Sequence, residues 1–258
     1  SIGTLGISSK NLNLNSGNTT LDPVSIHKVL QKLKKLKIDN VILEASSHGL
    51  HQYRLNNISF KTAIFTNLSR DHLDYHKNIK DYLNAKLYLF KKLLDMKGNI
   101  IFDDTTDQSK KLDTITKKRK LKKYTFGSPR SFIRIIKIQK INNQNQIDFT
   151  LNKRRHSFKT SLLGKIQIKN LMFAIIAAYL SKLKMNKILK SIQKIKPING
   201  RLENIGNLKN NSKVILDYAH TPNALQTVIS NIKDEFPLSK ISLVFGCGGN
   251  RDKNKRSE

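Results

Sequence analysis

Two short polar segments carry most of the side chains that could do chemistry. The first, residues 44–49, reads Glu-Ala-Ser-Ser-His-Gly and follows an apolar triplet. The second, residues 66–76, holds two aspartates and two histidines within eleven residues. Carboxylates and imidazoles so close together suit a divalent metal ion, to which Glu44 would add a further ligand. A hydrogen-bonded loop that caps a helix explains the second segment equally well, so both interpretations stay open at this point.

One lysine, Lys86, lies on an otherwise apolar helical stripe. The apolar residues of the stripe recur at helical spacing and are Ile79, Tyr82, Leu83, Leu87, Phe90, Leu93 and Leu94. The lysine could pack its stem there and extend its ammonium into water. Alternatively, burial disfavours the charged form and provides a neutral amine, as in catalytic or covalently modified lysines. The residues alone do not decide between these alternatives.

A glycine-rich turn, residues 246–252, begins like a dinucleotide-binding fingerprint. Arg251 stands where the third glycine of G-x-G-x-x-G belongs, so the fingerprint is incomplete. A glycine nest that binds a phosphate or carboxylate group, with Arg251 as the counter-charge, stays open. The sequence contains no phosphate loop of the type G-x-x-x-x-G-K-[ST], and no motif ties Cys247 to a histidine. We therefore interpret Cys247 as a packed or idle thiol.

Alternating helices and strands must position these residues. Asp22 begins a helix whose apolar residues recur as far as Leu36. Apolar runs predict buried strands at residues 41–43, 63–65 and 100–102. The alternation predicts an α/β fold with a mainly parallel sheet. Glu44, Asn67 and Asp103 follow the three strands, at the end of a parallel sheet where ligands bind.

The second half of the chain predicts a small antiparallel appendage and then a second domain. Short alternating runs within residues 123–161 are typical of antiparallel strands. The elements expected after them are helices at 171–179 and 188–195, strands at 214–216 and 241–245, and a helix from residue 222. Residues 197–200, Pro-Ile-Asn-Gly, interrupt this pattern. We therefore expect one domain at 1–196 and a second, partial Rossmann-like domain at 197–258.

The chain is strongly basic, with 48 Lys and Arg against 18 Asp and Glu and a formal net charge of +30. Such an excess first suggests a nucleic-acid or anionic-membrane partner. However, only ten of the 48 are arginines, whereas nucleic-acid surfaces favour arginine with interleaved aromatic residues. The densest run, residues 117–123, contains no aromatic residue, and we favour a solvated face over an anion-binding patch there. We therefore attribute the charge mainly to composition and expect neither nucleic acid nor membrane as a partner.

Cysteine content and hydropathy indicate the cellular compartment in which the protein is expected. A single cysteine excludes a disulfide framework and fits a reducing compartment. No apolar run reaches the roughly 18 to 20 residues that span a bilayer. These features favour a soluble cytoplasmic protein. Because the chain begins at Ser1 without a methionine and ends soon after the glycine-rich turn, we expect a fragment of a longer protein.

Taken in order, these motifs resemble those of the Mur ligase family, in particular its MurE type. The segments that resemble the family's central domain are residues 18–20, 44–54, 66–76 and Lys86. The segments that resemble the start of its C-terminal domain are residues 200–203, 217–225 and 246–256. Each motif alone is weak. Several independent motifs in the family's order, over nearly the whole chain, are specific.

The resemblance implies ATP-dependent amide-bond formation in peptidoglycan precursor synthesis. ATP would phosphorylate the terminal carboxylate of UDP-N-acetylmuramoyl-L-alanyl-D-glutamate, and the amine of meso-diaminopimelate or L-lysine would attack the acyl phosphate. Mg²⁺ ions would neutralise the charge that develops. The alternatives are another ligase of the superfamily, with a different amino acid or folate as substrate, and, much less favoured, a basic nucleic-acid-binding protein. We expect a monomeric enzyme.

The resemblance also implies roles for individual residues. Glu44 and His72 would bind Mg²⁺, and Lys86 would be carbamylated, which accounts for its place on an apolar stripe. The residues that would hold the muramoyl peptide are Asn18, Thr19, Thr20, Ser46, Gln52 and Arg54. The residues that would meet the nucleotide are Asn170 and Arg201, with Asp217 and His220 as catalytic residues brought in when the domains close.

Two segments of the family pattern are missing from the sequence. The phosphate-binding loop is expected before Ser1, and the segment that selects the diamino acid is expected after Glu258. The 258-residue chain is therefore expected to be inactive alone, whereas the longer protein would be the enzyme.

Overall fold

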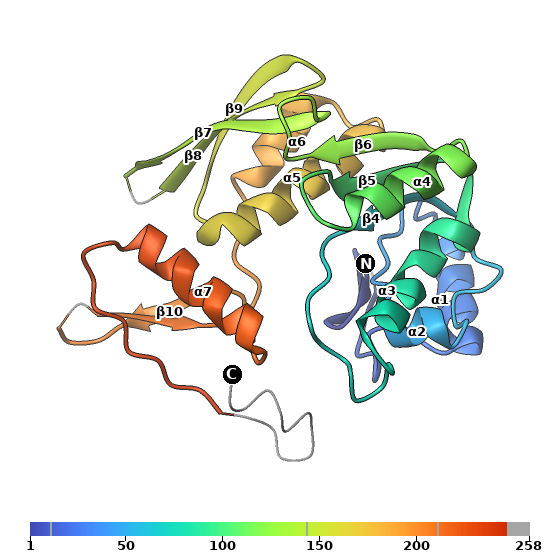
Figure 1. Cartoon of the computed structure of the whole chain (residues 1–258), viewed down its shortest axis with the longest axis horizontal. Coiled ribbons are helices and arrows are strands. Elements are labelled where there is room, and N and C mark those ends of the chain that lie inside the picture. The colour runs from blue at the N-terminus through green and yellow to red at the C-terminus, as the bar shows by residue number, and fades with distance from the viewer. Residues whose placement is uncertain (11, 143, 211, 247–258) are drawn as a thin grey trace. The chain divides into compact units, whose positions relative to one another are not determined.

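The computed structural model describes residues 1–10, 12–142, 144–210 and 212–246 (Figure 1). It divides into two compact units. Unit 1 is built from residues 1–63, 72–100 and 111–122, and unit 2 from residues 64–71, 101–110 and 123–258. Within the described ranges, no helix is both long and apolar enough to cross a membrane.

Unit 1 includes a small antiparallel sheet and the helices α1 to α3. The sheet has the strand order β1 (Ile2–Gly3), β2 (Gly6–Ser9) and β3 (Leu12–Leu14), and the helices are α1 (Pro23–Lys35), α2 (Ser47–His51) and α3 (Ile79–Tyr88). The helix predicted from Asp22 is confirmed. The Asp22 carboxylate accepts hydrogen bonds from the backbone N–H groups of Val24 and Ser25, and Pro23 occupies the first turn.

The strand predicted at residues 41–43 is wrong. Only Leu43 forms a bridge, a parallel one with Ile2, and the side chain of Ile42 is 77% exposed. Its neighbour β1 is two residues long, so within the described residues the apolar run has no continuous backbone partner. An apolar run becomes a strand only where another strand completes its hydrogen bonds.

Apart from Ile79, which is 38% exposed, the apolar stripe around Lys86 is buried, but it does not belong to one helix. Helix α3 passes into a π-helical turn, Leu89–Leu93, and Leu94 already begins strand β5 (Leu94–Asp103). The guanidinium of Arg119 donates hydrogen bonds to the carbonyl oxygens of Phe90 and Leu94, each at 2.8 Å. These donors satisfy the carbonyls at the end of the π turn, which helical spacing alone does not reveal.

A six-stranded sheet forms the centre of the α/β fold, as predicted. Its strand order is β4 (Phe60–Phe65), β5, β6 (Lys122–Phe126), β7 (Ile133–Ile141), β8 (Gln144–Leu151) and β9 (Arg154–Thr160), and helix α4 (Ser109–Lys118) precedes β6. Strands β6 and β7 pair in parallel. Strands β7, β8 and β9 pair antiparallel, which confirms the predicted appendage.

Unit 2 is held together by an apolar core between α5 and the antiparallel strands. The remaining elements are α5 (Gly164–Leu180), α6 (Met185–Ile192), β10 (Glu203–Asn207), β11 (Lys213–Leu216) and α7 (Pro222–Glu235). The core residues include Ile133, Ile147, Phe149, Phe158, Leu171, Met172, Ile175 and Ile176. The helix expected at residues 171–179 is confirmed as part of α5, and its residues Leu171, Met172, Ile175 and Ile176 are buried, whereas Tyr179 is 38% exposed.

The strand predicted at residues 241–245 is also wrong. These residues form no regular element, and Val244 is 97% exposed. Strands β10 and β11 pair with each other in an antiparallel ladder and not with this segment. The rest of the glycine-rich turn, residues 247–252, lies outside the described residues, so the predictions for Cys247 and Arg251 stay predictions.

Candidate active site

The carboxylate of Glu44 is held by a threonine that lies forty residues away in sequence. The backbone N–H and the hydroxyl of Thr4 both donate to Glu44 Oε2, at 2.9 Å each. The Thr4 hydroxyl also lies 3.0 Å from the hydroxyl of Thr19. A Cβ atom at Gly3 would lie 2.7 Å from Glu44 Oε2, so this approach requires glycine. Two hydroxyls and one oriented carboxylate therefore meet at this point of unit 1.

Thr20 connects Glu44 with the start of α2. Its side chain is 1% exposed; the hydroxyl donates to the Glu44 carbonyl and accepts from the backbone N–H of Ser46, both at 2.9 Å. Arg54 donates to the Thr20 carbonyl at 2.8 Å and to Gln52 Oε1 at 2.8 Å. Five of the predicted residues, Glu44, Thr19, Thr20, Gln52 and Arg54, thus belong to one hydrogen-bonded network.

Two further predicted residues have different surroundings. The Ser46 hydroxyl accepts the backbone N–H of Gly49 at 3.1 Å and so caps α2, which is a structural role. Asn18 is exposed, two residues before the buried Thr20. The structure therefore places Ser46 firmly and leaves Asn18 at the surface of unit 1.

Four imidazoles and two tyrosines pack beside this network. The ring of His48 lies 5.1 Å from that of His72 and 4.0 Å from that of Tyr75, measured between centroids. His76 is 3% exposed, bonds to the Ser47 hydroxyl at 3.0 Å and stacks on Tyr82 at 5.2 Å. His72 has a φ of 56°, a left-handed conformation that often marks functional positions in a non-glycine residue.

Tyr75 joins the imidazole cluster to the hydrogen-bonded network. Its hydroxyl accepts a hydrogen bond from Gln52 Nε2 at 3.1 Å and lies 2.9 Å from His51 Nδ1. Sequence reasoning missed Tyr75, Tyr82 and Thr4 as site residues. Tyr75 stands inside the polar segment 66–76, so its position was a usable signal, whereas nothing in the spacing connects Thr4 to Glu44.

The imidazole cluster favours neutral histidines. Burial lowers the pKa of His48, and the neighbouring His72 lowers it further. Burial likewise lowers the pKa of His76, with the imidazoles of His48, His51 and His72 adding to the effect. Each added proton would place a second positive charge beside the first at short range.

The unfolding free energy of the chain is expected to fall as the pH drops below about 6.5. In the unfolded chain His76 titrates normally, whereas in the fold its pKa is lowered, so the unfolded state binds more protons and acid favours it. The contribution is complete above pH 6.5 and is lost as the pH falls through the folded pKa. His76→Gln should flatten this dependence in urea unfolding at pH 7.5, 6.5 and 5.5, while His27→Gln on α1 should not. Equal slopes for all three proteins would contradict this interpretation.

Lys86 contacts the imidazole cluster through an aromatic ring. Its ammonium Nζ lies 4.7 Å from the centroid of the Tyr82 ring. The same ring lies 5.7 Å from that of His72 and stacks on His76. The half-buried lysine therefore sits on the ring that supports the predicted metal ligand His72.

The other predicted residues belong to unit 2. Asn170 is exposed on α5, next to Lys169, whose ammonium pairs with the Asp103 carboxylate at 2.5 Å. Burial raises the pKa of Asp103, but hydrogen bonds from Lys169 and Thr105 outweigh it, so the pKa lies below its ordinary value. Asp103 ends β5, as predicted.

The predicted residues after Gly200 cluster around one turn. The Asp217 carboxylate accepts the backbone N–H groups of Leu202 and Ala219, both at 2.8 Å, and Leu202 has a φ of 45°. The guanidinium of Arg201 lies 4.8 Å from the Tyr218 ring. His220 Nε2 lies 3.9 Å from the Asp71 carboxylate. Asp217 thus holds a strained turn that presents Arg201 and His220.

The residues around Glu44 offer oxygen donors that would suit a magnesium ion. In the described part of the chain, no group of three or more His, Cys, Asp or Glu side chains could hold a metal by itself. Mg²⁺ usually takes one or two carboxylates and completes its shell with water and phosphate oxygens. Both Thr4 donors bind Glu44 Oε2, and the hydroxyls of Thr4 and Thr19 add hard oxygen atoms. The donor chemistry therefore fits Mg²⁺ together with a bound phosphate.

Two solved ligase structures resemble this chain. A structure titled UDP-N-acetylmuramoyl-L-alanyl-D-glutamate–2,6-diaminopimelate ligase aligns with 98% of this chain and 51% of its own, with a TM-score of 0.76 and 29% identity. A MurF ligase from Thermotoga maritima in complex with ADP aligns with 72% of this chain and 42% of its own (TM-score 0.58, 13% identity) and supports the fold alone.

The chain belongs to the Mur ligase family. A family model described as the Mur ligase middle domain matches residues 1–178, and one described as the Mur ligase glutamate ligase domain matches residues 200–258. Two curated relatives are UDP-N-acetylmuramoyl-L-alanyl-D-glutamate–2,6-diaminopimelate ligases. That of Rickettsia bellii (strain RML369-C) is 36% identical and that of Wigglesworthia glossinidia brevipalpis 38%, each over 99% of this chain. The chain covers 54% and 51% of these relatives, about half their length.

Proposed function

We propose that the whole polypeptide carrying this chain is an ATP-dependent ligase that joins a diamino acid to UDP-N-acetylmuramoyl-L-alanyl-D-glutamate. The observation that carries the proposal is the network in unit 1, in which Thr4 and Thr20 fix Glu44 beside hydroxyl, amide and guanidinium groups. The names of the curated relatives favour meso-diaminopimelate over L-lysine as the amine.

The substrate side of the site is assigned to the polar groups around α2. Thr19, Thr20, Gln52 and Arg54 offer hydroxyl, amide and guanidinium groups, with Asn18 and Ser46 at the edges of the set. Such groups suit the pyrophosphate, sugar and peptide parts of the muramoyl substrate. The hydrogen bond between Arg54 and Gln52 supports this role because it orients both side chains before substrate arrives.

Glu44 and His72 are the residues that we assign to Mg²⁺, and Lys86 is assigned a carbamate. Bound Mg²⁺ would offset the negative charge shared by ATP and the substrate carboxylate. The ammonium of Lys86 would first lose one proton, and the neutral amine would then attack carbon dioxide and lose a second, so that a cation becomes an anion overall. The half-buried position of Lys86 on the Tyr82 ring supports this assignment, since the same ring packs against His72 and a carbamate there would lie near the proposed metal ligand.

Residues of unit 2 are assigned to the nucleotide. Asn170 on α5 would lie near the adenine, Arg201 would meet the phosphates, and Asp217 and His220 would complete the catalytic set. The strained turn held by Asp217 supports this assignment, because such conformations concentrate at functional sites. We expect a cytoplasmic monomer, and size-exclusion chromatography with light scattering tests the monomeric state directly.

The proposal is tested by ADP formation in the purified whole polypeptide. With ATP, Mg²⁺ and UDP-N-acetylmuramoyl-L-alanyl-D-glutamate, we expect sustained ADP release only after a diamino acid is added, faster with meso-diaminopimelate than with L-lysine. Mass spectrometry of the product should show one added residue. Parallel reactions with a single-amine amino acid, and with folate plus glutamate, serve as controls. Turnover with either control, and none with a diamino acid, would contradict the proposal. It would indicate a ligase of the same superfamily that acts on a different substrate.

A further inference from the structure

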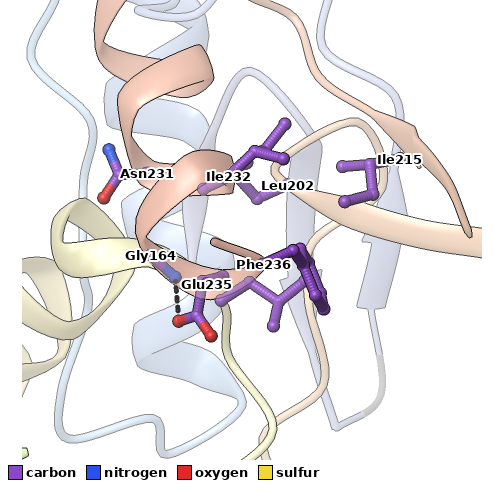
Figure 2. Close-up of a pocket in the computed structure, with 8 residues that line it drawn as sticks. Gly164, Leu202, Ile215, Asn231, Ile232, Glu235 and Phe236 are labelled. Carbon is purple, nitrogen blue, oxygen red and sulfur yellow. Dashed lines mark hydrogen bonds between the residues drawn. The ribbon is translucent and has the colours of Figure 1, made fainter. Parts of the chain in front are cut away.

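The N-terminus of α5 is capped by side chains of a different helix. Leu163, which precedes α5, provides no side-chain acceptor. Instead, the Glu235 carboxylate accepts the backbone N–H of Gly164 at 3.1 Å, and Asn231 Oδ1 accepts that of Lys165 at 2.6 Å. Both acceptors lie on α7, 71 and 66 residues further along the chain, and Figure 2 shows the Glu235 carboxylate reaching Gly164.

The two capping side chains are fixed by their surroundings. Asn231 is 5% exposed and donates through Nδ2 to the Thr227 carbonyl at 2.7 Å. The side chain of Glu235 is 12% exposed and also accepts from Asn145 Nδ2 at 3.0 Å. The residues that line a pocket beside them include Leu202, Ile215, Ile232 and Phe236 (Figure 2). With so little water nearby, an N–H group that lost its cap would find no ready replacement.

Gly164 allows the close approach that the caps need. Its φ is 78°, in the left-handed region that favours glycine. A Cβ atom at this position would lie 2.8 Å from Leu202 Cδ1 and 3.1 Å from Asn231 Cβ. The first residue of α5 is therefore matched in size and conformation to the side chains around it.

The capped end of α5 also leads to two residues that we assign to the nucleotide. One turn after the cap, Gln167 Nε2 donates to the carbonyl oxygen of Arg201 at 3.0 Å. Asn170 follows on the same helix, three residues later. The caps and the hydrogen bond of Gln167 thus both join the segment matched by the middle-domain model to the segment matched by the glutamate-ligase-domain model, and each segment carries a residue that we assign to the nucleotide.

We propose that Asn231 and Glu235 are positioning residues. They cap α5 from a different helix of the same chain, α7, and thereby set the spacing of Arg201 and Asn170 for ATP. The positive end of the α5 dipole favours a carboxylate at this position, and a side-chain acceptor satisfies each otherwise unpaired N–H. The effect on ATP rests on the proposed function, whereas the capping itself does not.

Hydrogen exchange and steady-state kinetics test the proposal together. Glu235→Ala and Asn231→Ala should each speed amide exchange in the first turn of α5 about five- to tenfold, although both substitutions lie on α7. In the whole polypeptide, each should raise the KM for ATP by a similar factor and leave kcat and the KM for the muramoyl substrate within about twofold. Glu235→Gln keeps an acceptor oxygen for Gly164. Its amide exchange in the first turn of α5 and its KM for ATP should therefore stay close to those of the wild type.

Asp234→Ala is the matched control, because Asp234 is the neighbouring acidic residue on α7. Within the part of the chain that the structure describes, its carboxylate pairs only with the exposed ammonium of Lys165, at 2.7 Å, and caps no backbone group. Identical exchange in Asp234→Ala and Glu235→Ala would overturn the proposal, as would a Glu235→Gln variant as impaired as Glu235→Ala. Exchange is measured without substrates, so an inactive polypeptide would refute the proposed function while the capping proposal is still decided.

Discussion

Replacing Lys86 by alanine is expected to lower the ligation rate about a thousandfold and to leave the fold intact. Lys86 Nζ lies over the ring of Tyr82, which packs against His72. A carbamate at this amine would place an anion beside the imidazole that we assign to Mg²⁺. Without it, the Mg²⁺ that would offset the negative charge of phosphoryl transfer would lose a nearby anion. The measurement is the rate of ADP formation with all substrates saturating, together with thermal unfolding of each variant.

Two companion variants separate the carbamate from the cation. Lys86→Arg keeps a positive charge over the Tyr82 ring but cannot be carbamylated under these conditions, so it should be as inactive as Lys86→Ala. Lys80→Ala removes an exposed lysine from the same helix and should retain activity. The wild-type rate should rise with added bicarbonate after carbon dioxide has been depleted. Equal rates in low and high bicarbonate would contradict the carbamate role.

Replacing Glu44 by glutamine is expected to lower kcat at least about a hundredfold. The amide oxygen of glutamine can still accept from both donors of Thr4, so the geometry at Gly3 is retained while the charge is lost. Mg²⁺ binds an amide oxygen more weakly than a carboxylate, so the Mg²⁺ concentration that gives half-maximal activity should also rise. Titration of the ADP-forming rate with MgCl₂ measures both effects.

Asp148→Asn provides the matched control for Glu44→Gln. Asp148 lies on β8 and accepts the hydroxyl of Ser157 at 2.7 Å, outside the network of unit 1. The same loss of one negative charge there should change neither kcat nor the Mg²⁺ dependence. A Glu44→Gln variant whose Mg²⁺ dependence equals that of Asp148→Asn would remove Glu44 from the metal site.

Local sequence predicts the parts of the fold that depend on neighbouring residues. Asp22 and Pro23 mark the start of α1 because a cap and a first-turn proline act within three residues. The hairpin strands of the antiparallel appendage pair with their nearest neighbours in sequence, so alternation reveals them. The runs at 41–43 and 241–245 failed for the opposite reason: apolar residues alone do not supply the backbone partner that a strand needs.

The candidate site likewise has a part that the sequence predicts and a part that depends on contacts between distant residues. Thr20, Ser46, Gln52 and Arg54 stand within motifs that resemble the family, and the structure brings them together. Contacts such as those of Thr4 with Glu44 join residues far apart in sequence and leave no pattern in the spacing. The caps that α7 provides for α5 cannot be predicted from the local sequence either, since no residue near Gly164 indicates an acceptor 71 residues away.

The central claim is that the site transfers a phosphoryl group from ATP to the substrate carboxylate before the amide bond forms. Labelling the terminal carboxylate of UDP-N-acetylmuramoyl-L-alanyl-D-glutamate with ¹⁸O tests it most directly, in the whole polypeptide with ATP and meso-diaminopimelate. Because the acyl phosphate retains a carboxylate oxygen in its bridge, the released phosphate should contain one ¹⁸O atom per amide formed. Amide product accompanied by unlabelled phosphate would contradict the account.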